Sequence, residues 1–285
     1  MFFVSDMFAE RYAGGAELTS EALICGATDN IEKIESLDVT TELIKANKDK
    51  YWIFGNFSMV PPAALLYAAK HLNYSILEYD YKYCKYRSPE KHTFLETDCE
   101  CHKESSGKVV SIFFAKAKSL WFMSENQKNH YEEIFPFLKK QNSFVLSSVF
   151  DADTLNFMKK LPTTNKNNKW LILNSGSWVK GTQDALAYAE EHKLEYFLAQ
   201  NLPYKKMLET LASCKGLIFL PPGRDTCPRL VIEAKLLDCE LAINTNVQHA
   251  TEEWFSSKET AYNYLEQRVA FFWHSVKKGK LSSSV

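Results

Sequence analysis

The stretch that decides the fold is GLIFLPPGRDTCPRLVIEAKLL, residues 216–237. It begins with a short apolar run, passes through a turn that contains proline and glycine, and continues with apolar residues at helical spacing. A buried strand that leads through a short turn into a helix is typical of parallel α/β sheets, in which ligands bind at the carboxyl ends of the strands. The stretch therefore predicts an α/β domain with a candidate site at this strand end.

The same alternation of strand and helix extends along most of the chain. Apolar runs that are typical of buried strands occur at residues 2–5, 51–55, 74–79, 119–123, 144–146, 170–173, 195–199, 216–220 and 240–244. Helical spacing predicts helices at 15–23, 62–71, 125–135, 182–191, 204–212 and 229–237. Strands interleaved with helices predict an α/β fold with parallel sheets.

The strands fall into two series, which predict two domains. We place the first domain at residues 1–150 and the second at 151–257, with the polar stretch 162–169 as the junction between the series. The end of the chain, 258–285, is expected to form a helix that packs back on the first domain and frays at its last residues.

The composition excludes several classes of protein. Of the 285 residues, 46% are hydrophobic and 24% are charged, which is typical of globular proteins and not of disordered, collagen-like or coiled-coil chains. The net charge of -1 offers no general attraction to nucleic acid. No apolar run is long enough to cross a bilayer, so we expect a cytoplasmic protein whose membrane contacts could only be peripheral. Seven cysteines without a secretory leader are expected to be reduced thiols.

Two glycine-containing turns are candidate anion sites. Gly14 and Gly15 stand between a strand and a helix, where a glycine backbone can approach a ligand and the helix N-terminus favours a phosphate. Lys180 and Gly181 end the loop that follows strand 170–173, which is where open α/β sheets bind anions. The alternatives are an ordinary strand-to-helix turn in the first case and a solvated surface lysine in the second.

The third candidate is the charged cluster within residues 216–237. It holds Arg224, Asp225, Arg229 and Glu233, and the two carboxylates could face one crevice from the loop and from the first turns of the helix. Charged groups with perturbed pKa values gather in such clefts, although a capped helix with a surface ion pair would have the same sequence.

Together these motifs resemble the large retaining, nucleotide-sugar-dependent family of GT-B glycosyltransferases. The resemblance implies two Rossmann-like domains that face a central cleft. It also implies a hexosyltransferase-like enzyme that moves a sugar from a nucleotide-diphosphate donor to a carbohydrate or other hydroxyl acceptor, with retention of configuration. Gly14 and Gly15 are similar to the family's glycine-rich first loop, which contacts the donor diphosphate, and Lys180 is similar to its phosphate-binding lysine.

Asp225 and Glu233 have the spacing of the family's paired-glutamate motif. By this resemblance Asp225, one methylene shorter than the usual glutamate, is a catalytic residue that faces the donor sugar, and Glu233 binds the nucleotide ribose. The family's arginine in the lysine loop is missing here. We expect Arg229, acting with the backbone amides of Leu230 and Val231, to supply the second contact to the diphosphate, and Arg224 is the alternative.

Asp80 is the second predicted catalytic residue. Tyr79-Asp80-Tyr81 is similar to a His-Asp-Tyr segment of part of the family, and we expect Asp80 to act on the acceptor side. The nucleotide-sugar is a co-substrate, so the resemblance implies no other cofactor and no divalent metal at the donor phosphates. Cys84, Cys99 and Cys101 could form a zinc set with His92 or His102, but their spacing lacks a paired C-x-x-C, so we expect inert thiols and no metal.

Two other functional classes can be compared with this interpretation. A nicotinamide-dependent Rossmann enzyme needs G-x-G-x-x-G after its first strand, and residues 13–16, AGGA, do not supply it. A GT-B relative that acts as a nucleotide-sugar-binding or scaffold module, with little or no activity, remains an alternative because of the missing arginine and the shortened Asp225.

Overall fold

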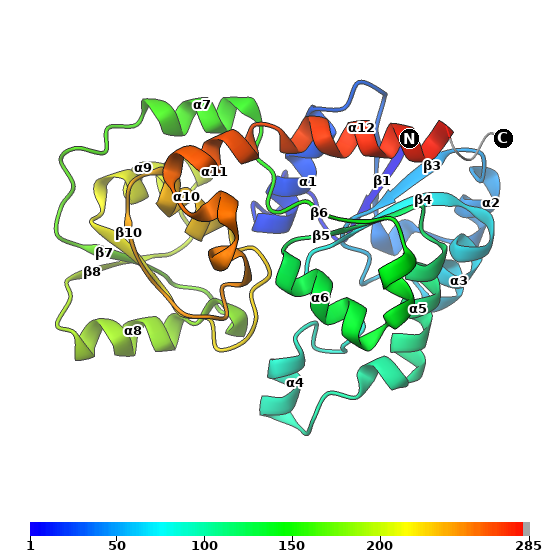
Figure 1. The fold of residues 1–285 in the computed structure, drawn as a ribbon, viewed down its shortest axis with the longest axis horizontal. Helices are drawn as coiled ribbons and strands as arrows, with labels where there is room; N and C mark the ends of the chain where they lie inside the picture. The colour runs from blue at the N-terminus through cyan, green and yellow to red at the C-terminus, as the bar shows by residue number, and fades with distance from the viewer. Residues whose placement is uncertain (282–285) are drawn as a thin grey trace. The chain divides into compact units, whose positions relative to one another are not determined.

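The computed structural model describes residues 1–281, apart from the side chains of 279–281, and divides the chain into two compact α/β units (Figure 1). The first unit contains residues 1–149 together with the C-terminal segment that begins at Gln267, and the second contains residues 150–266. Every strand pairing within the two sheets is parallel. No helix among residues 1–281 is both long enough and apolar enough to cross a lipid bilayer.

The first unit has a six-stranded sheet in the order β2-β1-β3-β4-β5-β6. Its strands are β1 (Phe2–Ser5), β2 (Glu32–Glu35), β3 (Tyr51–Phe54), β4 (Asn73–Glu78), β5 (Ser119–Phe122) and β6 (Ser143–Val145). Its helices are α1 (Gly15–Cys25), α2 (Thr41–Ala46), α3 (Pro62–His71), α4 (Pro89–Leu95), α5 (Ser105–Lys116), α6 (Glu125–Ile134) and α12 (Arg268–Leu281). Aromatic side chains fill the core, for example Phe113 of α5, which stacks on Tyr74 of β4.

The second unit has a four-stranded sheet in the order β10-β9-β7-β8. Its strands are β7 (Trp170–Leu173), β8 (Tyr196–Ala199), β9 (Gly216–Phe219) and β10 (Glu240–Ile243). Its helices are α7 (Ala152–Lys160), α8 (Thr182–Glu191), α9 (Tyr204–Ser213), α10 (Arg229–Leu236) and α11 (Lys258–Leu265). A smaller core surrounds Ile172 and Ile218 on the two central strands.

The direction in which the strands are added changes once in each sheet. In the first, β2 lies on one side of β1 and β3 on the other; in the second, β8 lies on one side of β7 and β9 on the other. Such switch points are where open α/β sheets bind ligands, at the carboxyl ends of the strands. All predicted site residues follow the carboxyl end of a strand in one of these two sheets.

The C-terminal segment differs from its prediction. It forms two helices instead of one: α11 belongs to the second unit and packs on α10, whereas α12 packs on α1 of the first unit. Trp273 of α12 donates a hydrogen bond to the carbonyl of Leu23 at 2.8 Å. Residues 282–285 of the predicted helix lie outside the described residues.

One further local prediction was wrong, and one strand was not predicted. The polar stretch 162–169 lies inside the second unit, because the chain changes unit at Val149–Phe150 and at Glu266–Gln267. The edge strand β2 was missed because, in its sequence EKIE, only Ile34 is buried and the other side chains are charged.

Candidate functional site

The loops that follow β7 and β9 bring Lys180 and Asp225 together. The Nζ of Lys180 lies 2.7 Å from Oδ2 of Asp225, and the Asp225 side chain is only 10% exposed while that of Lys180 is 31% exposed. The two residues are 45 positions apart in the sequence. The candidate catalytic acid and the candidate phosphate-binding cation are therefore direct neighbours at the switch point of the second sheet.

Gly181 allows the two loops to approach so closely. Its φ of 63° is left-handed, and a Cβ placed there would lie 1.9 Å from the carbonyl oxygen of Leu220 in the loop after β9. Because the obstacle is backbone, a side chain at this position would push the loops apart. Thr182 fixes the first loop further, since its hydroxyl donates to the Leu173 carbonyl at 2.8 Å and accepts from the Ser175 amide at 3.1 Å.

The backbone of Asp225 is held on both sides by the segment after β10. Its amide donates to the Asn246 carbonyl at 2.9 Å, and its carbonyl accepts from the Gln248 amide at 3.1 Å. This short parallel bridge with residues 246–248 orients the Asp225 side chain without help from a ligand.

A second charged pair lies on α10. Nε of Arg229 is 3.0 Å from Oε1 of Glu233, and the same carboxylate oxygen accepts a 2.7 Å hydrogen bond from the Tyr204 hydroxyl. The Arg229 guanidinium also lies against Phe150, with its Cζ 3.6 Å from the ring centroid. Burial raises the pKa of Glu233, although Arg229 and Tyr204 favour its charged form.

These contacts change the expectation for Arg229. The residue is 5% exposed, and its guanidinium is engaged with Glu233, Tyr204 and Phe150. This arrangement favours a role in positioning Glu233. Among the amides predicted to bind phosphate, that of Val231 donates to the Pro228 carbonyl at 3.1 Å, and Leu230 lies one residue earlier in the first turn of α10.

The glycine pair of the first unit stands at the start of α1. Gly14 is the residue that precedes the helix, and Gly15 is its first residue. A Cβ on Gly14 would lie 2.4 Å from Oε2 of Glu17, so glycine lets the Glu17 carboxylate fold back over the helix N-terminus. Burial raises the pKa of Glu17. A carboxylate therefore occupies part of the space beside this helix end.

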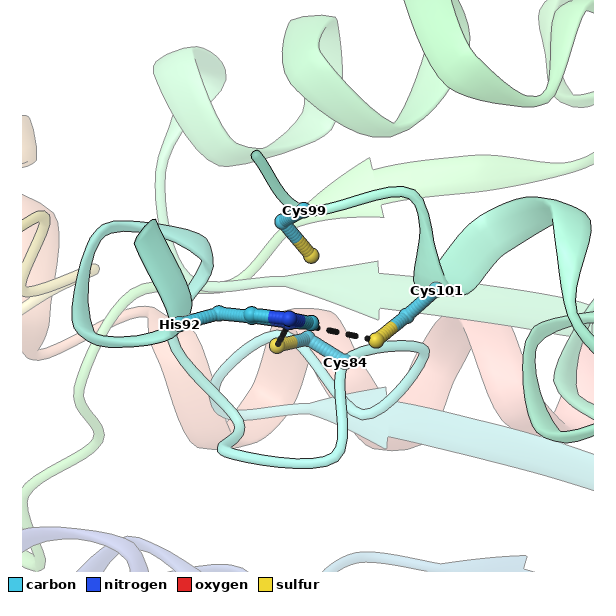
Figure 2. A group of neighbouring side chains, drawn as sticks. All are labelled: Cys84, His92, Cys99 and Cys101. Carbon is cyan, nitrogen blue, oxygen red and sulfur yellow. Dashed lines mark hydrogen bonds between the residues drawn. The ribbon is translucent and has the colours of Figure 1, made fainter. Parts of the chain in front are cut away.

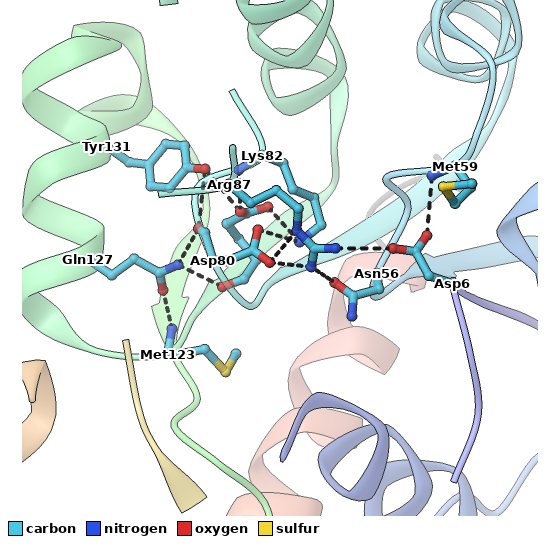
Figure 3. A network of polar contacts seen from close by, with 10 residues as sticks. Asp6, Asn56, Met59, Asp80, Lys82, Arg87, Met123, Gln127 and Tyr131 are labelled. Atoms are coloured by element: carbon cyan, nitrogen blue, oxygen red, sulfur yellow. Dashed lines mark hydrogen bonds and ion pairs between the residues drawn. The ribbon is translucent and has the colours of Figure 1, made fainter. Parts of the chain in front are cut away.

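Asp80 lies in a polar network at the carboxyl ends of β1, β3, β4 and β5 (Figure 3). Arg87 donates to its carboxylate from Nε at 2.7 Å, and Lys82 does so from Nζ at 3.2 Å. Arg87 also bonds Asn56 and pairs with Asp6, so one guanidinium links three strand ends. Burial opposes ionisation of Asp80, but the charges of Lys82 and Arg87 outweigh it and lower the pKa of the carboxyl. An acid held in this way is a weak proton acceptor.

Glu78 supports the same network from inside the sheet. It is fully buried and accepts hydrogen bonds at 3.0 Å from the Tyr131 hydroxyl and from the Lys82 amide. Burial raises its pKa to about 7, against the influence of Lys82. The Gln127 side chain donates to the carbonyls of Glu78 and Asp80, which fixes the backbone that carries Asp80.

One cluster in the first unit contains metal-ligand side chains. The ligand atoms of Cys84, His92, Cys99 and Cys101 all lie within 4.8 Å of one another (Figure 2). His92, not His102, is the histidine of this group.

The predicted site residues therefore form separate groups. Lys180 lies with Asp225 and Arg229 with Glu233 in the second unit, whereas Gly14, Gly15 and Asp80 lie in the first. Several partners of these residues were not predicted from the sequence, among them Tyr204 and Arg87. The tyrosine begins a predicted helix, and the arginine is one of only a few in the chain, but neither position carries a recognisable motif.

Searches with the sequence identify no relative, whereas searches with the structure identify proteins of the same fold. No protein-family model and no curated protein sequence matches the chain. HepE of Anabaena, solved with UDP and glucose, has a TM-score of 0.54 at 12% identity, covering 99% of both chains. An alpha-glucosyltransferase solved with UDP and a 13-mer DNA has a TM-score of 0.52 at 9% identity, covering 97% of this chain and 98% of its own. The N-terminal domain of a Candida albicans trehalose-6-phosphate phosphatase has a TM-score of 0.56 at 8% identity, covering 100% of this chain and 96% of its own.

These similarities extend over almost the whole length of each protein. The predicted fold class, α/β with the GT-B architecture, is therefore confirmed.

Proposed function

We propose that this protein is a glycosyltransferase that moves a sugar from a nucleoside-diphosphate donor to an acceptor hydroxyl, with retention of the anomeric configuration. The observation that carries the proposal is the Lys180–Asp225 pair at the switch point of the second sheet. Proteins of the same fold have been solved with UDP and with UDP-glucose, which supports a uridine nucleotide as the first donor to test.

Lys180 would stabilise the leaving group. Transfer of the sugar leaves an additional negative charge on the diphosphate, and a positioned ammonium in a partly buried site stabilises such charge. Asp225 holds this ammonium at 2.7 Å and is itself fixed through its backbone, so the cation is already in place before the reaction. The same carboxylate would then orient the donor sugar. No divalent metal would be required for this step.

Glu233 would bind the ribose hydroxyls of the donor. Arg229 and Tyr204 would act as positioning residues, because both hold Oε1 of Glu233 at 3.0 Å or less. The function proposed for Arg229 is thus indirect, since its guanidinium is stacked on Phe150.

Asp80 would orient the acceptor hydroxyl by accepting a hydrogen bond from it. Its lowered pKa, which Lys82 and Arg87 cause against the effect of burial, makes it a poor base. We therefore assign the removal of the acceptor proton to a donor phosphate oxygen, on the face of the sugar from which the leaving group departs. This geometry retains the anomeric configuration. NMR of the product's anomeric proton tests it, and an inverted product would refute it.

The decisive experiment compares ligands with and without phosphates. A panel of nucleotide-sugars is screened for thermal stabilisation, and the nucleoside diphosphate of the best donor and its bare nucleoside are titrated by calorimetry. Lys180→Ala should weaken binding of the diphosphate at least tenfold and leave the nucleoside unchanged. Lys215→Ala is the matched control, because Lys215 pairs with Glu240 at the opposite, amino-terminal ends of β9 and β10. The proposal fails if no nucleotide stabilises the protein, or if both ligands lose affinity equally.

The second candidate function is a nucleotide-sugar-binding or scaffold module without useful activity. It is favoured by the short Asp225 side chain, which is already engaged with Lys180. Donor binding together with no transfer to any acceptor and no slow release of nucleoside diphosphate into water would support this candidate over the enzyme.

A further inference from the structure

We propose that Cys84, His92, Cys99 and Cys101 bind a structural zinc ion in the first unit. The four side chains converge from the segment before α4, from α4 itself, and from the segment between α4 and α5 (Figure 2). This inference is independent of the proposed sugar transfer.

The spacing of the ligand atoms fits tetrahedral coordination. With Zn–S bonds of about 2.3 Å and Zn–N bonds of about 2.0–2.1 Å, neighbouring sulfur and nitrogen ligands should be about 3.6 Å apart. Nδ1 of His92 lies 3.3 Å from Sγ of Cys101 and 3.7 Å from Sγ of Cys84. All four atoms lie within 4.8 Å of one another, so a small contraction around a central ion completes the shell.

The chemistry of the group favours zinc in a structural role. Three thiolates and one imidazole are a known set for tetrahedral zinc, with no position left open for substrate, and soft sulfur ligands disfavour magnesium and calcium. Cys84, Cys101 and His92 are buried, and Cys99 is partly buried. The seven cysteines form no disulfide in the described part of the chain.

The hydrogen-bond environment of the other His92 nitrogen, Nε2, also favours metal binding. While Nδ1 faces the thiols, Nε2 lies 3.5 Å from Oε2 of Glu96. That carboxylate is itself held by Lys85, whose Nζ is 2.7 Å away, and by the hydroxyl of Tyr86. A carboxylate on the far nitrogen of a ligating histidine fixes its orientation and makes the near nitrogen a better ligand.

The surrounding backbone holds the ligands in place. Ser88 caps α4 by accepting a hydrogen bond from the Lys91 amide at 3.2 Å, which sets the helix that carries His92. Gly107 of α5 packs directly on the loop of Cys101, where a Cβ would lie 2.2 Å from the Cys101 carbonyl oxygen. Both ligand-bearing segments are therefore ordered by contacts other than the thiols.

The ion would stabilise the candidate acceptor side of the molecule. Arg87 follows Cys84 by three residues, and its amide donates to the Cys84 carbonyl at 2.8 Å. Arg87 has a left-handed φ of 57° and binds Asp80 and Asn56 through its side chain. Loss of the ion should loosen this segment and with it the Asp80 network.

The experiment measures metal content in the full-length, untagged chain produced in zinc-supplemented medium. We expect about one zinc per chain by mass spectrometry, as for a single four-ligand structural site. Cys101→Ser and His92→Gln should lower the content at least fivefold. Cys214→Ser, which changes a buried thiol of the second unit, is the matched control and should keep the ion.

A second measurement, on the wild-type protein, tests the proposal even if the variants fail to fold. Wild-type protein stripped of metal is reloaded with Co²⁺, which should produce a thiolate-to-cobalt charge-transfer band and the visible bands of tetrahedral cobalt. Addition of zinc to the stripped protein should raise the melting temperature of the first unit. The proposal is overturned if the wild type carries no zinc and shows neither response, or if peptide mapping finds a disulfide among Cys84, Cys99 and Cys101.

Discussion

Replacing Gly181 by alanine tests whether the close contact between two loops builds the candidate donor site. An L-residue in the left-handed region costs about 1–2 kcal/mol. The added methyl group would also meet the Leu220 carbonyl oxygen at 1.9 Å and the Pro221 nitrogen at 2.9 Å, and overpacking of this kind costs about 1–3 kcal/mol. We therefore expect Gly181→Ala to lower the stability of the second unit by about 2–5 kcal/mol.

The assay is native-state hydrogen exchange of the amides in β7 and β9, which reports the opening free energy of this unit by itself. A loss of this size should speed the exchange of the slowest amides at least tenfold. It should also separate Lys180 from Asp225 and thereby weaken binding of the nucleoside diphosphate.

Gly176→Ala is the matched control for this experiment. Gly176 lies in the same loop and is exposed, and a Cβ added to it would have no heavy atom within 4 Å. Its replacement should change stability by no more than about 0.5 kcal/mol. Equal exchange rates in Gly181→Ala and the wild type would refute the reasoning.

Two further predictions concern buried ionisable side chains. Burial lowers the pKa of His249 from 6.5 to about 3, so below pH 6.5 the unfolded chain takes up a proton that the folded chain does not, and stability should fall by about 1.4 kcal/mol per pH unit. In urea titrations between pH 7 and about pH 4, the free energy of unfolding of His249→Phe should therefore fall less than that of the wild type. The control His192→Gln, which changes an exposed histidine, should follow the wild type. An equal dependence of stability on pH in the wild type and His249→Phe would contradict this. Glu233→Gln should weaken binding of both nucleoside and nucleoside diphosphate at least tenfold in calorimetry, about 1.4 kcal/mol, because the proposed function places the lost charge at the ribose. A loss confined to the diphosphate would rule out this role.

Much of the fold could be predicted from the sequence because it depends on local patterns. The strand at 170–173 and the helices at 62–71 and 182–191 have the predicted bounds, since apolar runs and helical spacing record burial directly. The edge strand β2 was not predicted because only one of its four side chains is buried. The division of the last segment into α11 and α12 was not predicted because two consecutive amphipathic helices produce one continuous pattern of apolar and polar residues.

The sequence by itself also determined which residue types meet at the strand ends. Lys180 and Asp225 follow adjacent central strands, and the carboxyl ends of parallel strands meet at one edge, so their proximity follows from the motif and the topology. Only the tertiary structure decided the partners of the other groups. Tyr204 and Glu233 are 29 positions apart, Phe150 and Arg229 are brought together from distant parts of the second unit, and His92 rather than His102 faces the thiols. Side-chain pairing over such distances depends on how the helices pack against the sheet and on which side chains are buried next to one another. A linear pattern of residue types does not contain that information.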